Sequence, residues 1–280
     1  TQGVSSAASD VYKRQGLHKM SDQLSVPDHI TQEGQTYKDS FDHGTERWTL
    51  AGILQNSSNV GMIMAGENYP DEQRYEYLTK FGIGQPTGLN LPGESSGLLT
   101  NPSAWDLRTR NTILFGQGYA VNALQLNNVV ATIANKGVKQ QQSIIKSTTD
   151  ANGKTTETKK GEATRVVDEK VASDMMNAME SVAEGYNKFV KVDGYRMAAK
   201  SSTAEVQGSD GTLSSIISDY SVVIPADNPR YAVTVVMKDP NGVFGGLTAG
   251  PVSAQICEFL MQKYEVPVSG PRKNAIPVTW

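Results

Sequence analysis

Residues 216–237 read IISDYSVVIPADNPRYAVTVVM, and this stretch decides the fold class. It contains two apolar runs, 216–224 and 231–237, that are rich in the β-branched residues typical of strands. The link between them, PADNP, is rich in turn-forming residues, so the two runs are predicted to pair antiparallel as a hairpin. A further strand is expected over 195–205, upstream of this hairpin.

Helices are expected on the N-terminal side of the sheet. A helix capped by Thr45 would carry Leu50, Ile53 and Leu54 at i, i+3 and i+4 spacing, which places them on one face. Further helices are predicted over 60–64, 75–81, 122–136 and 168–185, and a closing helix is predicted to open at Pro251. Helices followed by an antiparallel sheet indicate the α/β class of the α+β type, with the sheet packed by helices.

The composition excludes several classes of function. Lys and Arg total 26 against 29 Asp and Glu, a net charge of −3, so no basic surface for nucleic acid is expected. Cys257 is the only cysteine, which excludes an internal disulfide and a cysteine-rich metal site. No apolar run reaches about 18 residues, the length needed for a membrane span, and no signal peptide is recognisable.

The two ends of the chain differ in character from its middle. Residues 1–15, TQGVSSAASDVYKRQ, have neither helical nor strand periodicity and are interpreted as an anomalous, non-native end. Residues 16–266 are expected to form one domain, and the Pro-rich residues 267–280 a tail on its surface. On this interpretation the natural protein continues upstream, and the chain is a C-terminal part of it.

Two short polar motifs stand out from these elements. Ser57-Ser58-Asn59 lies in a break between two helical runs, and Lys200-Ser201-Ser202-Thr203 lies in the strand expected over 195–205. Taken alone, each is typical of a loop or a helix cap. Together they approach two of the three elements S-x-x-K, S-D-N and K-T-G, which mark serine acyl transferases that react with penicillin.

Longer segments around both motifs resemble one known family. These segments are LQNSSNVG (54–61), FGIGQPTGLNLPGE (81–94), FGQG (115–118), GYRMAAK (194–200) and PADNPRYA (225–232). In content, order and spacing they resemble the transpeptidase domain of class B penicillin-binding proteins. The resemblance implies a penicillin-binding, serine β-lactamase-like transpeptidase fold. It also implies a D,D-transpeptidase that cross-links cell-wall stem peptides by serine acyl transfer.

The resemblance also implies roles for individual residues. Ser57 would bond to Lys200 and pass a proton toward the leaving amine, and Asn59 would offer its amide to the substrate backbone. Lys200 would place a positive charge near the substrate carboxylate. No metal or organic cofactor is required, and β-lactams as well as stem peptides are expected to bind.

The substrate-binding residues implied by the resemblance follow Lys200 directly. The hydroxyls of Ser201 and Thr203 would hold the carboxylate, and the Thr203 N–H would form half of an oxyanion hole. Alternation along a strand predicts that Ser202 shares a face with Lys200, away from Ser201 and Thr203. The family has Gly where Ser202 stands, so its side chain either crowds the floor of the cleft or is accommodated there.

The nucleophile motif of the family is missing from its expected place. An S-x-x-K should precede Val26, and none occurs there; the one match, Ser143-Ile-Ile-Lys146, follows the second motif and is in the wrong order. Residues 16–266 are therefore expected to be a partial transpeptidase domain, and the chain as given to be inactive. The full-length protein is expected at the extracytoplasmic face of the bacterial plasma membrane. It would be held there by an N-terminal anchor missing from this sequence, with other cell-wall synthesis proteins as further partners.

Two alternatives remain open at this point. The first is a non-catalytic penicillin-binding sensor or divisome structural module of the same fold, which Ser202 favours. The second is a β-lactamase, which fits poorly with the 82–94 loop and the 225–232 hairpin. An intact S-x-x-K in the upstream gene sequence would favour the enzyme, and its absence would favour the binding module.

Overall fold

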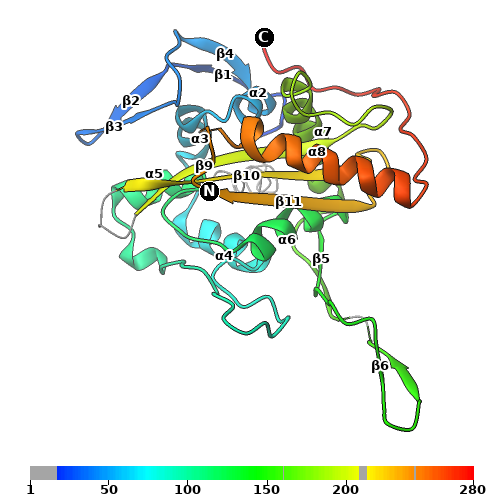
Figure 1. Ribbon diagram of the computed structural model, residues 1–280. Coiled ribbons are helices and arrows are strands. Elements are labelled where there is room, and N and C mark those ends of the chain that lie inside the picture. The colour runs from blue at the N-terminus through cyan, green and yellow to red at the C-terminus, as the bar shows by residue number, and fades with distance from the viewer. Residues whose placement is uncertain (1–17, 160, 208–212, 243) are drawn as a thin grey trace.

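The computed structural model describes residues 18–159, 161–207, 213–242 and 244–280. A central antiparallel sheet is flanked by helices, and smaller hairpins lie at the periphery (Figure 1). The helices are α2 (Leu50–Gln55), α3 (Asn59–Gly66), α4 (Asp71–Phe81), α5 (Leu107–Leu114), α6 (Ala123–Ala134), α7 (Glu169–Gly185) and α8 (Gly245–Lys263), with a 3₁₀ turn at Pro102–Ala104. The strands are β1 (Gln23–Val26), β2 (His29–Gln32), β3 (Gln35–Lys38), β4 (Glu46–Thr49), β5 (Val138–Gln140), β6 (Ser147–Thr149), β7 (Thr155–Glu157), β8 (Ala163–Arg165), β9 (Ala198–Gln207), β10 (Leu213–Ile224) and β11 (Tyr231–Lys238).

The central sheet has the strand order β11–β10–β9, with both pairs antiparallel. The hairpin predicted over 216–237 is confirmed, because Ile224 pairs with Tyr231 across the short turn. On the other side of β10, Ser221 pairs with Lys200 and Asp219 pairs with Ser202. This register brings the K-S-S-T motif beside the middle of β10.

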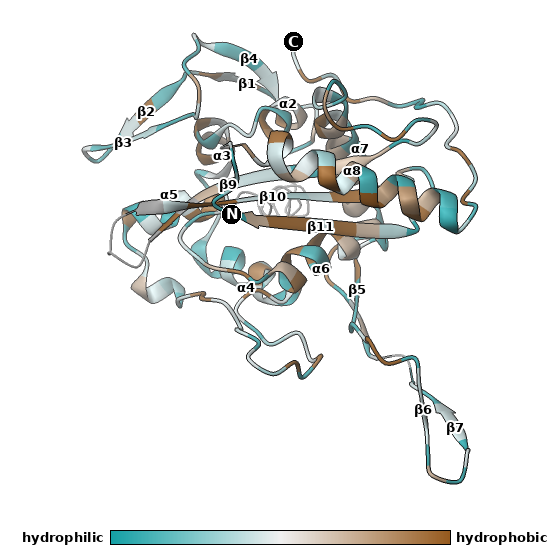
Figure 2. Ribbon diagram, in the orientation of Figure 1, coloured by the Kyte–Doolittle hydropathy of each residue, from teal (hydrophilic) through white to brown (hydrophobic). Residues whose placement is uncertain are grey.

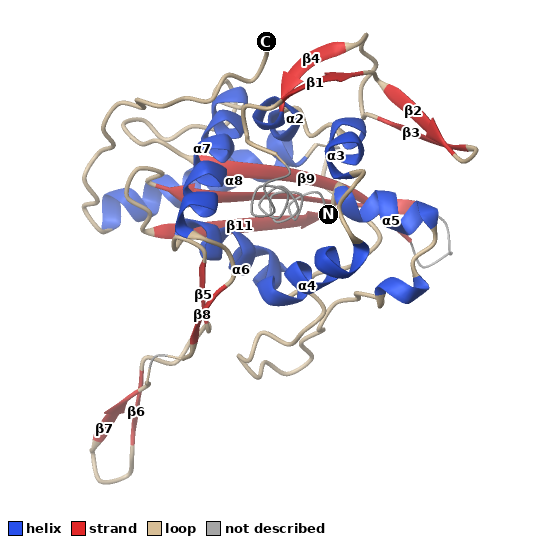
Figure 3. Cartoon of the chain, turned by 180° about the vertical axis from the view of Figure 1, so that it is seen from behind, coloured by secondary structure: helices blue, strands red, loops and turns tan. Residues whose placement is uncertain are grey.

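The sheet separates two apolar clusters. Beneath α8, Tyr220, Val222 and Ile224 of β10 pack with Cys257 and Met261. On the other face, alternate residues such as Ala198 and Val223 belong to the larger cluster, together with residues of α2, α6 and α7. Figure 2 shows hydrophobic colours along β11 and in parts of β10, and the view from behind in Figure 3 shows α6 and α7 against the sheet. This two-sided packing matches the period-two burial expected of a strand covered on both faces.

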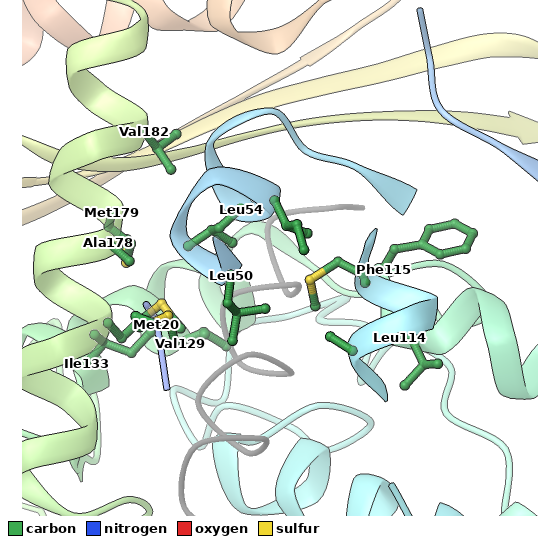
Figure 4. Close-up of a cluster of buried hydrophobic side chains, with 14 of the residues drawn as sticks. Met20, Leu50, Leu54, Leu114, Phe115, Val129, Ile133, Ala178, Met179 and Val182 are labelled. Carbon is green, nitrogen blue, oxygen red and sulfur yellow. The ribbon is translucent and has the colours of Figure 1, made fainter. Parts of the chain in front are cut away.

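The short helix α2 lies inside the larger cluster. Leu50 and Leu54 are buried, with Met179 and Val182 of α7 to one side and Phe115 to the other (Figure 4). A six-residue helix has little stability of its own, so this packing fixes its position. The motif Ser57-Ser58-Asn59 follows α2 directly, and its place therefore depends on the same core.

Two predicted helix starts are wrong. The cap of α2 is Thr49 rather than Thr45, because residues 46–49 pair with β1 as strand β4 and Gly52 N donates to Thr49 Oγ1 at 3.1 Å. The closing helix begins at Gly245, and Pro251 lies inside it. A Cβ at Gly245 would overlap with the carbonyl oxygens of Ser202 and Asp219. The absence of a side chain at Gly245 is thus needed for close packing of α8 on the sheet.

The Pro-rich tail runs mostly exposed over the surface and returns to β4. Thr49 N donates to Val278 O at 3.1 Å, and Thr49 Oγ1 donates to Pro277 O at 2.6 Å. Trp280 N donates to Arg47 O at 3.2 Å. We call residues 276–280 the C-terminal strap, since they bind the strand that leads into α2.

The anomalous residues 1–15 lie outside the described part of the chain. Within the described ranges, none of the helices has the length and apolar character to span a membrane.

Candidate active site

The second motif forms a fixed turn between α2 and α3. Ser57 has a left-handed backbone with φ of 52°, a conformation that costs a non-glycine residue about 1–2 kcal/mol. Ser58 is fully buried, caps α3 by accepting from Gly61 N at 2.8 Å, and donates to Asp39 at 2.6 Å. The same carboxylate accepts from Val60 N at 3.0 Å and lies 3.1 Å from Nε2 of His43. These contacts hold the turn so that Ser57 is directed toward the sheet.

Lys200 reaches Ser57 from the sheet side. Its side chain is fully buried, and Nζ donates to Ser57 Oγ at 2.5 Å and to Ser201 O at 2.8 Å. Burial lowers the pKa of Lys200 from the ordinary 10.5 to about 8, and the negative charge of Asp219 acts in the opposite direction. An ammonium with such a pKa can exchange a proton with a neighbouring hydroxyl near neutral pH.

Asn59 lies two residues after Ser57, at the first position of α3. The two residues line one small pocket, together with Leu54, Met62 and Phe115. The Asn59 amide donates to Lys38 O at 3.0 Å, so in this state part of its hydrogen-bonding capacity is used by β3. The structure thus joins Ser57 and Lys200 directly, whereas the Asn59 amide lies beside Ser57 but bonds to the backbone of β3.

The residues that follow Lys200 alternate between the two faces of β9. Ser201 Oγ lies 3.0 Å from the Tyr186 hydroxyl, and Thr203 Oγ1 accepts from Gly245 N at 3.2 Å. Ser202 points to the same face as Lys200 and donates its hydroxyl to the Asp219 carboxylate. The side chain of Ser202 is therefore accommodated by a partner on β10.

Three residues near the motifs were missed in the sequence. Asp39 anchors the Ser57 turn, Tyr186 meets Ser201, and Asp219 meets Ser202. A pattern was available for Asp219, because it is an acidic residue inside the apolar run 216–224. Asp39 and Tyr186 stand in polar segments of the sequence, where no local pattern distinguishes them.

The out-of-order motif Ser143-Ile-Ile-Lys146 lies far from this site. Both Ser143 and Lys146 are exposed, in the segment that leads into the β6–β7 hairpin. This hairpin projects away from the body of the molecule (Figure 1). Ser143 is therefore excluded as a partner of Ser57 and Lys200.

A buried lysine that bonds a serine, on a strand that carries two further hydroxyl side chains, is an arrangement shared with the serine acyl transferases that react with penicillin. The family model described as "Penicillin binding protein transpeptidase domain" matches residues 13–258, and the chain belongs to this family. The predicted family and fold are thereby confirmed.

Named relatives agree with this family. "Penicillin-binding protein PbpB" of Mycolicibacterium smegmatis is 33% identical over 268 residues, which cover 91% of this chain and 41% of the relative. "Peptidoglycan D,D-transpeptidase FtsI" of Escherichia coli K12 is 36% identical over 213 residues, which cover 74% of this chain and 34% of the relative. The chain therefore spans less than half the length of these two relatives.

Solved structures show the same fold. A peptidoglycan synthetase from Bifidobacterium adolescentis is 64% identical with a TM-score of 0.95, covering 99% of this chain and 51% of that one. Penicillin binding protein 3 of Mycobacterium tuberculosis, complexed with aztreonam, is 30% identical with a TM-score of 0.90. The match covers 100% of this chain and 64% of that one.

Proposed function

We propose that the full-length protein is a peptidoglycan D,D-transpeptidase that cross-links stem peptides by serine acyl transfer. In this proposal, the described chain supplies the proton relay and the substrate clamp. The observation that carries it is the 2.5 Å bond between Lys200 Nζ and Ser57 Oγ, which joins motifs 143 positions apart. The names of the relatives support the same reaction.

The relay would work through Ser57. Its hydroxyl would donate a proton to the leaving amine and recover one from Lys200, whose pKa of about 8 suits this exchange. Asn59 would exchange its bond to Lys38 O for one to the substrate backbone. The acylated serine would come from an S-x-x-K motif that the given sequence does not contain upstream of Ser57.

The clamp would use the face of β9 opposite to Lys200. Ser201 and Thr203 would turn from Tyr186 and Gly245 N to the substrate carboxylate. The Thr203 N–H would stabilise the oxyanion of the tetrahedral intermediate. A β-lactam presents the same carboxylate and acyl group, so it should occupy the same positions.

Location and partners follow from this function. Stem peptides lie outside the plasma membrane, so the full-length protein would act at its extracytoplasmic face, together with other cell-wall synthesis proteins.

Covalent labelling tests the proposal. The full-length gene product is expected to form a stoichiometric adduct with a fluorescent penicillin, mapped by mass spectrometry to a serine upstream of Ser57. The 280-residue chain alone should form none, because it lacks an S-x-x-K in that position. A full-length product that stays unlabelled would contradict the proposal, and an adduct on the 280-residue chain would contradict the assignment of the nucleophile.

A second candidate is a non-catalytic penicillin-binding sensor or divisome structural module of the same fold. The observation in its favour is Ser202, which replaces the glycine of the family. Reversible, non-covalent binding of penicillin by the full-length product would support this candidate.

A further inference from the structure

A buried serine–carboxylate pair lies next to Lys200 and has no part in the mechanism above. Ser202 and Asp219 face each other across β9 and β10, and the Ser202 hydroxyl donates to Oδ2 of Asp219. Each residue is 1% exposed. A carboxylate so far from water is costly unless charge or hydrogen bonds compensate it.

The Ser202 hydroxyl compensates only one of the two carboxylate oxygens. Oδ1 of Asp219 is buried and has no hydrogen-bond partner among the described residues. Burial raises the pKa of Asp219 above its ordinary value, and the bond from Ser202 and the charge of Lys200 offset part of this rise. The site therefore holds an acid whose charge depends on its two neighbours.

Lys200 and Asp219 are diagonal neighbours on one face of the sheet. Lys200 on β9 pairs with Ser221 on β10, and Asp219 pairs with Ser202. Asp219 is therefore two positions along β10 from the residue opposite Lys200. Diagonal positions in an antiparallel pair are about 7–8 Å apart, close enough for strong interaction in a buried environment. The attraction acts on a lysine that is fully buried and bonded to Ser57.

We propose that Asp219 is a positioning residue for Lys200. Its carboxylate, held by Ser202, supplies the negative charge that keeps the buried ammonium protonated and directed at Ser57. Ser202 thus acts on the relay through Asp219 rather than by touching the substrate. The link to acyl transfer rests on the proposed function, whereas the coupling of the two charges does not.

The other elements packed around β9 bring no competing carboxylate to Lys200. On α7, Glu180 is paired with Arg196 at 2.8 Å, and Glu184 is paired with Arg272 at 2.6 Å. Tyr186, the residue directly after α7, meets Ser201 on the opposite face of the strand. On α8 the buried titratable group is Cys257, whose pKa burial raises to about 12. Within the described residues, the charge that acts on Lys200 is therefore that of Asp219.

The test is a pH titration of Lys200 in the full-length gene product, followed by NMR of isotope-labelled lysine side chains. Asp219→Asn is expected to lower the titration midpoint of Lys200 by about one pH unit or more. The matched control is Asp239→Asn, since Asp239 also accepts from a serine of β10, Ser215, at 2.8 Å. The control should leave the midpoint in place. A folded Asp219→Asn protein with an unshifted midpoint would overturn the proposal.

A second variant keeps the test decisive if Asp219→Asn does not fold. When two titrating groups interact, a signal from one of them also reports the titration of the other. Protonation of Asp219 should therefore appear as a low-pH step in the Lys200 resonance. Ser202→Ala removes a bond to the charged carboxylate and should move that step to higher pH. An absent or unmoved step would refute the coupling. Penicillin labelling of the unmodified protein reports separately on the proposed function.

Discussion

The carbonyl oxygen of Val278 occupies the space where a side chain on Gly52 would stand, so that a Cβ at this position would overlap with it. Gly52 lies in α2, which leads into the turn of Ser57, and Val278 lies in the C-terminal strap. The C-terminal strap thus packs on the helix that leads into the second motif.

Gly52→Ala is expected to destabilise the protein by about 1–3 kcal/mol, because the backbone of the strap must move away. In a helix, alanine is more favourable than glycine by about 1 kcal/mol. A lower free energy of unfolding for Gly52→Ala would therefore show that the overlap with Val278 outweighs this gain. Urea unfolding gives the free energy. Gly44→Ala is the control, since no atom lies within 4 Å of a Cβ there. Equal stability of both variants would mean that the strap does not pack on α2.

Asp39→Ala should loosen the turn that carries Ser57. The change leaves the buried Ser58 hydroxyl and the Val60 N–H without their acceptor, at a cost of about 1–3 kcal/mol for an unsatisfied buried group. Thermal unfolding measures the loss, and the exposed neighbour Asp42→Ala serves as control. A loss no greater than that of the control would show that Asp39 does not anchor the turn.

The parts of the fold that could be predicted from the sequence are those that a local sequence pattern determines. The hairpin over 216–237 is an example, because a short turn and apolar strands determine its pairing. The meeting of Ser57 and Lys200 was expected from the resemblance to a family, since the two motifs are far apart in the chain.

The failures have tertiary causes. Thr45 and Thr49 are equally good caps locally, and pairing of 46–49 with β1 decides between them. The closing helix is predicted to open at Pro251, yet it begins at Gly245, whose lack of a side chain lets α8 approach β9 and β10. The Ser202–Asp219 pair depends on the register between β9 and β10. That register shifts at an irregularity between Leu213 and Ser215, so it could not be predicted by counting residues along the sequence.

Lys200 should make stability depend on pH above 8. The folded protein loses the Lys200 proton at about 8, whereas the unfolded chain keeps it up to about 10.5. Between these values the unfolded state binds more protons, so the free energy of unfolding rises with pH. The gap corresponds to about 3 kcal/mol at most.

The measurement compares urea unfolding at both ends of this window with that of Lys200→Met. Ionisation of Cys257, whose pKa is raised to about 12 in the folded protein, opposes the trend but is common to both proteins. From pH 8 to pH 10.5, the free energy of unfolding of the unmodified protein should therefore increase relative to that of Lys200→Met. A constant difference would show that Lys200 keeps its ordinary pKa.

Ser202 and Lys200 should contribute unequally to penicillin acylation by the full-length gene product. Lys200→Ala removes a charge-assisted bond to Ser57 worth about 1.5–3 kcal/mol, which is roughly a ten- to more than hundredfold loss in rate. Ser202→Gly should be milder, because the Ser202 hydroxyl bonds to Asp219 and does not stand between Lys200 and Ser57. Its effect should be a modest loss, since Asp219 then protonates more readily. A marked gain in acylation from Ser202→Gly would instead show that this side chain obstructs the site, and would favour the non-catalytic module over the enzyme.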